Sequence, residues 1–385
     1  MREGSWDEAY AIASQTFSTL PAEAVALSQS VGRFLASPAR ALCDLPAYAT
    51  SSMDGWAVRG SGPWKIVGEI ATGKAPSQSL ADSECMKIST GGVIPTGATS
   101  VMPWENATET EAKIQGRTKE GENIRPAGVE SKMGDLLIDS GLRLNPPMVG
   151  LLAATGHDLI LVTRKPRIAI FFLGDELLHE GVPNDGSIRD ALGPQLPALL
   201  ESYGAEVTQA QFIKDDLGTL THSIEKSLDD VDMIITTGGT ADGPKDFVRP
   251  VIQHIKGQYI IDCVRVRPGY HIIVAKVSRG DREIPFVALP GNPQSALAAL
   301  TSFGRPIIHS FLGAPHTDLM TLELKETFQT QPEFSRLVPG NIDRRVFTPT
   351  GYLGSAMLRG VAHASGFALV APGGTTARWL PLPRF

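Results

Sequence analysis

The stretch ITTGGTADGPKD, Ile235–Asp246, decides the fold, because a run that is typical of a buried strand passes directly into two glycines and charges of both signs. Gly238 and Gly239 lack a Cβ atom, so their backbone can approach a ligand closely. In open α/β sheets, ligands bind beyond the carboxyl ends of the strands. We therefore interpret Ile235–Asp246 as a ligand-binding loop, with an ordinary strand-to-helix turn as the alternative.

The region around this loop alternates between strand-like and helix-like runs. From residue 166 to 312 the order is RIAIFFL, LGPQLPALLESYG, EVTQAQFI, LGTLTHSIEKSLD, VDMIITTGG, FVALPGN and PQSALAALTSFGRPIIHSFL. Such alternation indicates a parallel sheet that is covered by helices on both faces. We therefore predict an α/β domain over 166–312.

The remaining sequence predicts a multidomain protein, since 385 residues exceed what one core usually serves. Helix-like spacing from Asp7 to about Leu42, and GLRLNPPMVGLLAATGHDLILVTRKP later, predict a helical and extended linker domain from residues 1–45 and 136–165. Short strand-like runs broken by Gly and Pro predict a small β-rich domain over 46–135 and a C-terminal β domain over 313–385.

Composition narrows the protein class. A hydrophobic content of 42%, a net charge of −6 and a pI near 5.8 predict a globular protein without a nucleic-acid partner. Cys43, Cys85 and Cys263 form no Cys-x-x-Cys pair, and no apolar run approaches the length of a membrane span. We expect no membrane association and a cytoplasmic location.

Further glycines and acids follow the predicted strands. Gly291, Asn292 and Ser295 in ALPGNPQSA form a second loop that could hold a phosphate. Glu176, Asp190, Asp216 and Asp246 follow other strands, and carboxylates near a phosphate require a cation such as Mg²⁺ between them. Taken singly, each acid could instead be a helix N-cap or part of a solvated face. Their joint occurrence predicts phosphate and Mg²⁺ chemistry.

Eight motifs in order resemble the MoeA family of molybdopterin molybdenumtransferases, whose fold the C-terminal part of gephyrin shares. They are DLPAYATSSMDGWAV, ISTGGVIPTGATSVMP, ENIRPAG, GDEL, TTGGTADGPKD, RVRPG, LPGNPQSA and GSAML. The resemblance implies a molybdopterin-binding α/β domain similar to MoaB and MogA. It also implies Mg²⁺-dependent insertion of molybdate into adenylylated molybdopterin with release of AMP, by a homodimer whose active cleft is shared between subunits.

The resemblance also implies roles for individual residues. Asp54 and Thr90 would come from the partner subunit, and Asp54 with Glu176, Asp190 and Asp246 would be catalytic. Metal contacts would involve Glu176, Asp190, Asp216 and Asp246. The remaining substrate contacts would be Gly238, Gly239, Thr240, Arg267, Pro268, Gly291, Asn292, Ser295, Arg336 and Ser355. Guanidinium forks and hydroxyls suit a tetrahedral dianion. For Asp54 a tight turn is the alternative.

Several positions depart from the family pattern. Phe172 and Leu173 replace a serine and a threonine, Leu192 replaces an amide, and Ala241 replaces a serine. Tyr270 and His271 replace the lysine and proline of the family's PGKP, which removes one cation from the anion pocket. Two functions therefore remain open: a working insertase with a re-lined pocket, and a paralogue that binds a pterin nucleotide or a partner protein with little or no activity. A nucleotide-dependent enzyme of another kind is more remote, because neither a P-loop nor a Gly-x-Gly-x-x-Gly motif is present.

Overall fold

The computed structural model describes residues 1–241, 243 and 246–383, and its largest domain contains a seven-stranded sheet. The strands are ordered β1-β19-β21-β22-β18-β14-β17. Four neighbours are parallel: β22 (Arg282–Leu289), β18 (Met233–Thr237), β14 (Arg167–Leu173) and β17 (Glu206–Ile213). The predicted parallel sheet is confirmed for these strands.

The other half of this sheet contains the antiparallel pairs. β21 (Ile273–Arg279) runs against both β22 and β19 (Gln258–Val264), and β1 (Arg2–Gly4) adds to β19 in parallel. A tight turn at Gly280, whose φ is 60°, joins β21 to β22. So short a connection permits only an antiparallel pair, since parallel strands need a long crossover.

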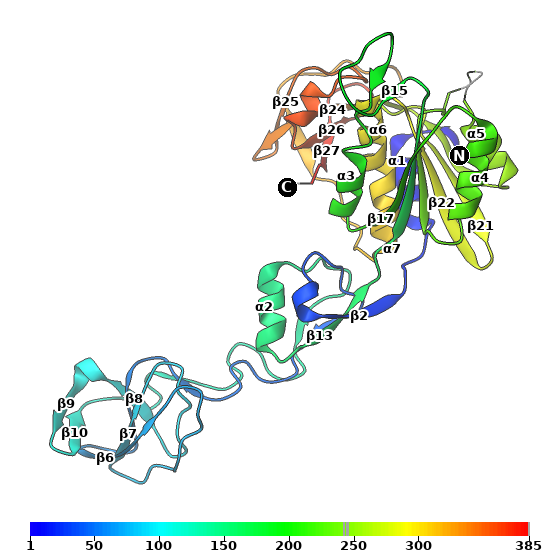
Figure 1. The fold of residues 1–385 in the computed structure, drawn as a ribbon. Coiled ribbons are helices and arrows are strands. Elements are labelled where there is room, and N and C mark those ends of the chain that lie inside the picture. The colour runs from blue at the N-terminus through cyan, green and yellow to red at the C-terminus, as the bar shows by residue number, and fades with distance from the viewer. Residues whose placement is uncertain (242, 244–245, 384–385) are drawn as a thin grey trace.

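Helices cover both faces of the sheet, as predicted (Figure 1). One face packs against α1 (Trp6–Gln15), α3 (Leu196–Ser202), α6 (Pro293–Ala299) and α7 (Arg305–Phe311), the other against α4 (Leu217–Ser227) and α5 (Val248–His254). Ile235 of β18 faces the first core and Ile234 the second, which is the two-residue alternation of a strand. No helix among the described residues has the length and apolar character needed to cross a membrane.

The linker domain corrects one prediction. The helical spacing from Asp7 to about Leu42 corresponds to one α-helix, α1, which begins at a capping box between Ser5 and Glu8, and to a single 3-10 turn at Leu27–Gln29. After Pro21 the chain forms β2 (Ala22–Ala26), which pairs with β13 (Leu159–Thr163). Proline cannot donate to a helix ladder, and the antiparallel partner takes up the backbone groups that follow. α2 (Pro146–Ala154) begins at Asn145, next to the predicted Pro start.

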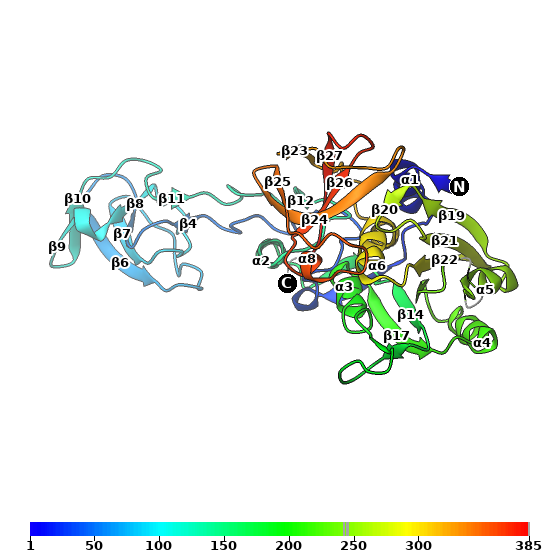
Figure 2. The same ribbon diagram turned by 90° about the horizontal axis from the view of Figure 1, so that it is seen from above.

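The β-rich domain stands apart from the α/β domain in both views (Figures 1 and 2). Its six-stranded sheet has the order β8-β5-β7-β6-β10-β9. The bounds are β5 (Gly55–Val58), β6 (Trp64–Ile70), β7 (Glu84–Ile88), β8 (Ser100–Pro103), β9 (Ala107–Thr110) and β10 (Lys113–Gly116). The linker domain lies between the two bodies, so the chain is elongated.

The C-terminal strands close into a small barrel. The order is β20-β24-β25-β23-β27-β26, and a further pairing of β24 with β26 closes the ring. The bounds are β20 (Val266–Arg267), β23 (Thr321–Leu324), β24 (Ser335–Asp343), β25 (Val346–Pro349), β26 (Gly366–Val370) and β27 (Ala377–Pro381). β20 precedes the barrel by more than fifty residues and joins it to the α/β domain. The exact boundaries of the four predicted domains stay predictions.

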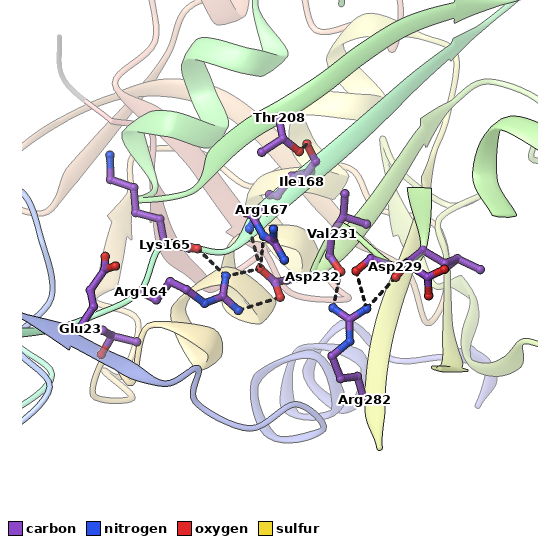
Figure 3. A network of polar contacts seen from close by, with 12 residues as sticks. Glu23, Arg164, Lys165, Arg167, Ile168, Thr208, Asp229, Val231, Asp232 and Arg282 are labelled. Carbon is purple, nitrogen blue, oxygen red and sulfur yellow. Dashed lines mark hydrogen bonds and ion pairs between the residues drawn. The ribbon is translucent and has the colours of Figure 1, made fainter. Parts of the chain in front are cut away.

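A buried ion pair fixes the junction between the linker and α/β domains (Figure 3). Arg164, which follows β13, donates to both carboxylate oxygens of Asp232 at 2.6 and 2.9 Å, and the Arg167 N–H donates to the same carboxylate at 2.8 Å. Burial alone raises the pKa of Asp232, but the hydrogen bonds and charges of Arg164 and Arg167 outweigh it and hold the pKa below its ordinary value. The exit direction of the linker is therefore held by charged hydrogen bonds.

Candidate active site

A pocket of about 380 Å³ lies between the α/β domain and the C-terminal barrel. Six residues that the sequence assigned to substrate binding line it: Arg267, Pro268, Asn292, Ser295, Arg336 and Ser355. They come from the loop after β20, the turn before α6, the start of β24 and the loop at residues 353–355. The structure thus brings together residues that are up to 88 positions apart.

Two arginines on neighbouring strands give the pocket its charge. Arg267 of β20 and Arg336 of β24 are paired in register, so they lie side by side. Arg336 donates to the Gln329 carbonyl at 3.0 Å, and the Arg267 guanidinium lies 5.4 Å from the centre of the Phe334 ring. In the described part of the chain neither has an ion-pair partner. Two adjacent guanidinium groups without carboxylates form a site for a multiply charged oxyanion.

Polar groups at the start of α6 complete the wall opposite the arginines. The Asn292 amide lies 3.5 Å from the Ser355 hydroxyl, and the Ser295 N–H donates to the Ser355 carbonyl at 3.2 Å. Gln294 donates to the Leu353 carbonyl at 3.3 Å. These bonds join the barrel loop to the helix, so Ser355 reaches the pocket although it lies in another domain.

The substituted loop at residues 270–271 also lines the pocket. The Tyr270 hydroxyl donates to Glu3 of β1, and this bond, with burial second, raises the pKa of Tyr270 to about 12. The Tyr270 ring packs against His271 and Phe334, with ring centres 4.9 and 5.8 Å apart. An aromatic wall anchored to the N-terminal strand therefore stands where the family has a lysine and a proline.

The two glycine loops meet at the same edge of the sheet. Gly238 and Gly239 have φ values of 81° and 65°, a region that favours glycine. A Cβ atom on Gly291 would lie 3.5 Å from the Gly238 Cα, so the loops after β18 and β22 are neighbours. Thr240 is buried beside them. Asp242 and Lys245 lie outside the described residues.

Three of the four acids assigned to metal, Glu176, Asp216 and Asp246, follow β14, β17 and β18, whereas Asp190 follows the short strand β16 (Ile188–Arg189). Each of the four accepts local backbone hydrogen bonds or is exposed. Asp190 is buried and accepts from the N–H groups of Leu192 and Gly193 at 2.9 to 3.1 Å. Asp216 is the N-cap of α4 and accepts from Thr219. Asp246 accepts from the Gly243 N–H at 2.5 Å, and Glu176 is exposed.

These contacts match the alternative that the sequence left open for the single acids. Over the described residues, no three His, Cys, Asp or Glu side chains are grouped so that they could hold a metal ion. The described residues therefore include no cluster of side chains that could hold a metal ion by itself, and the assignment of Glu176, Asp190, Asp216 and Asp246 to Mg²⁺ stays a prediction. Mg²⁺ often binds through one or two carboxylates together with substrate phosphates, a mode that such separated acids still permit.

Asp54 and Thr90 lie together on the β-rich domain. The Asp54 carboxylate accepts from the Thr90 N–H at 2.6 Å and from the Thr90 hydroxyl at 3.1 Å. Gly55 makes this turn possible, because a Cβ there would lie 2.0 Å from the Met102 carbonyl oxygen. In both views this domain is far from the pocket of its own chain (Figures 1 and 2).

The other departures from the family pattern are mostly packing residues. Phe172 is buried and stacks on Phe212 with ring centres 4.9 Å apart, and Leu192 belongs to the same core. Leu173 packs under Gly239, and Ala241 is exposed. Of the substituted residues, only Tyr270 and His271 line the pocket.

Several pocket residues were missed by the sequence reasoning. Gln329, Thr330, Gln331 and Phe334 line the pocket from the segment before β24, and Glu3 supports it from the N-terminal strand. No local motif marks them, since their position depends on the pairing of β20 with β24 and of β1 with β19.

Comparisons with known proteins agree with this architecture. Residues 4–156 match the MoeA N-terminal region (domain I and II), and residues 169–310 match a probable molybdopterin binding domain. Molybdopterin molybdenumtransferases of Staphylococcus epidermidis and Staphylococcus aureus are each 30% identical to the chain. The alignments cover 91% and 93% of this chain and 87% and 89% of those proteins.

Solved structures show the same fold. A molybdopterin biosynthesis MoeA protein from Pyrococcus horikoshii superimposes with a TM-score of 0.82 at 24% identity, over 100% of both chains. Another structure of a molybdopterin biosynthesis MoeA protein from Pyrococcus horikoshii gives a TM-score of 0.80 at 20% identity, over 98% of this chain and 99% of that one. From its sequence relatives across nearly the whole length, together with this multidomain α/β fold, the chain belongs to the MoeA family of molybdopterin molybdenumtransferases, which act in molybdenum cofactor biosynthesis.

Proposed function

We propose that this chain inserts molybdate into adenylylated molybdopterin and releases AMP in a Mg²⁺-dependent reaction. The observation that carries the proposal is the pair Arg267 and Arg336, which lie side by side on β20 and β24 and have no carboxylate partner among the described residues. Molybdate is a tetrahedral dianion, and two guanidinium forks can bind its oxygens through charged hydrogen bonds. The Ser355 hydroxyl and the Asn292 amide supply neutral donors on the opposite wall.

The remaining predicted substrate residues suit the phosphate part of the nucleotide. Gly238, Gly239 and Gly291 expose backbone at the carboxyl edge of parallel strands, where α/β sheets commonly bind phosphates. Mg²⁺ would supply charge neutralisation at these phosphates, and Glu176, which is exposed at this edge, is one acid that could contact it. Asp190, Asp216 and Asp246 would mainly hold the loops in place through their backbone hydrogen bonds.

The proposal includes a homodimer with shared sites. Asp54 and Thr90 cannot line the pocket of their own chain, because the elongated linker separates the two domains (Figures 1 and 2). The β2–β13 ribbon of that linker exposes an apolar face, with Leu159 63% and Leu161 47% exposed. A second copy that covered this ribbon would remove apolar area from water. Sedimentation velocity of the purified chain tests the dimer, and a monomer at working concentration would refute it. A cytoplasmic location stays a prediction.

A binding protein without efficient chemistry is the second candidate, and the Tyr270 wall favours it. Loss of one charged donor from an anion site weakens binding, and the Tyr270 hydroxyl is already bonded to Glu3. In this case the pocket would still hold a pterin nucleotide, but without turnover.

Reconstitution separates the two functions. The purified chain is mixed with adenylylated molybdopterin, molybdate and Mg²⁺, and AMP is followed with time. Catalytic AMP release that requires molybdate supports the insertase. Tight nucleotide binding with no AMP release above the rate without protein supports the binder, and it would refute the proposed reaction.

A further inference from the structure

A second cavity, of about 540 Å³, lies between α1, α7, the loop at residues 313–320 and β27. None of its lining residues belongs to the candidate active site. Its walls include Tyr10 and Trp379, and its polar groups include Ser14, Arg305 and His309. The cavity is therefore large, part aromatic and part polar.

Arg305 is the unusual residue of this cavity. It is only 8% exposed, and it donates one hydrogen bond, to the Pro381 carbonyl at 2.8 Å. Its guanidinium lies 5.9 Å from the centre of the Tyr203 ring. Among the described residues it has no carboxylate within ion-pair distance; Asp318, an exposed residue, lines the same cavity but forms no ion pair with Arg305.

A buried cation without an anion is unfavourable, because the charge has lost its water and gained no partner. Buried arginines are therefore usually paired with carboxylates, and in this chain even the half-buried Arg164 is paired with Asp232. Arg305 instead faces a space that could hold many water molecules or one organic molecule. The missing partner is thus expected in the cavity.

The neighbouring groups also suit an anion. His309 lies one turn after Arg305 and lines the same cavity, and its imidazole forms no hydrogen bond with another described residue. Burial, with the charges of Arg305 and Arg143, lowers the pKa of His309 to about 4, so it is a neutral donor near pH 7. Tyr10, Leu319 and Trp379 offer apolar surface beside these donors.

We propose that this cavity binds a small organic anion, with its carboxylate or phosphate head on Arg305 and its apolar body between Tyr10 and Trp379. The size of the cavity favours such a ligand over a bare inorganic ion, which would leave most of the space to water. The inference rests on Arg305 and does not depend on the proposed insertase reaction.

Isothermal titration of the full chain at fixed ionic strength tests the site with three probes. Benzoate carries a carboxylate head, phenyl phosphate a phosphate head, and benzamide the same ring without charge. We expect saturable binding of at least one anion and at least tenfold weaker binding of benzamide, since a hydrogen bond to a charged group contributes about one to two orders of magnitude. The tighter of the two anions identifies the head group.

Variants connect the binding to Arg305. Arg305→Met should weaken the anion at least tenfold, whereas Arg378→Met should not, because Arg378 lies outside the cavity and is already paired with Asp7 at 2.7 Å. Thr317→Trp fills the exposed rim and keeps Arg305, so it tests the cavity if Arg305→Met fails to fold. Equal affinity of wild type and folded Arg305→Met, unchanged binding in Thr317→Trp, or failure of both benzoate and phenyl phosphate to bind more tightly than benzamide would overturn the proposal. Dissociation of an oligomer by the anion would also overturn the proposal, since the cavity would then be the contact site of a second copy of the chain.

Discussion

Replacing Tyr270 with lysine tests the charge of the candidate molybdate pocket. The family lysine at this place would add a third cation next to Arg267 and Arg336. The structure adds one condition, because the Tyr270 hydroxyl already contacts Glu3. A lysine would pair with that carboxylate, so Tyr270→Lys alone should raise the rate only partly. Tyr270→Lys combined with Glu3→Gln should raise it further.

The size of the effect follows from the exposure of the pocket. A hydrogen bond from a charged group contributes about 1.5–3 kcal/mol, which corresponds to roughly a ten- to hundredfold change. Arg267 is exposed, so water screens the charges and the lower end applies. We expect kcat/KM for molybdate to rise about tenfold in the double variant relative to Glu3→Gln, and less in Tyr270→Lys relative to wild type.

The assay is AMP release from adenylylated molybdopterin over a range of molybdate concentrations. Tyr270→Met is the matched control, because it changes the wall without adding charge. If the double variant and Glu3→Gln have the same kcat/KM at low ionic strength, the cation at this position does not matter. The interpretation of the pocket as the molybdate site would then be wrong.

Three further predictions follow from described contacts. Asp246→Asn, which weakens the acceptor for the Gly243 N–H, should lower AMP release or nucleotide affinity several-fold by the same assay and by titration with AMP; unchanged values in both would disprove the placement of the acidic loops. Asp232→Asn should lower the free energy of unfolding in urea by roughly 2–5 kcal/mol, since Arg164 would lose its anion, and a change below about 1 kcal/mol would contradict the junction described above. Because burial lowers the pKa of His309 from 6.5 to about 4, the neutral form stabilises the fold above pH 6.5 and this contribution is lost as the pH falls toward 4. Between pH 7.5 and 5, wild type should therefore lose about 2 kcal/mol more unfolding free energy than His309→Gln, and parallel pH profiles of the two proteins would refute this.

The sequence predicts the α/β domain well because each of its elements is encoded locally. Continuous apolar runs mark the buried strands β14 and β18, and an amphipathic run marks α4. The expected helical structure between Asp7 and Leu42 forms only as α1, because a pairing with β13, more than a hundred residues later, decides the structure after Pro21. Periodicity within a segment carries no information about such a partner.

The candidate site shows the same limit. Sequence order places Asp190, Asp216 and Asp246 after strands, but it cannot show that nearby N–H groups already occupy their carboxylates. The proximity of Arg267 and Arg336 came only from the resemblance to a family, since their contact depends on β20 joining the barrel. Neither a local sequence pattern nor the family resemblance indicated Phe334 and Glu3.

The long reach of the linker has a consequence for mixed assemblies. If the dimer forms as proposed, each pocket receives Asp54 from the other chain. Two different inactive variants can then complement each other in a mixed dimer. A chain altered only at Asp54 and a chain altered only at Arg267, when exchanged into the same dimer, would together make one site with both residues intact and one site with neither. Random exchange between two inactive variants would therefore give about a quarter of the active sites of the wild-type protein.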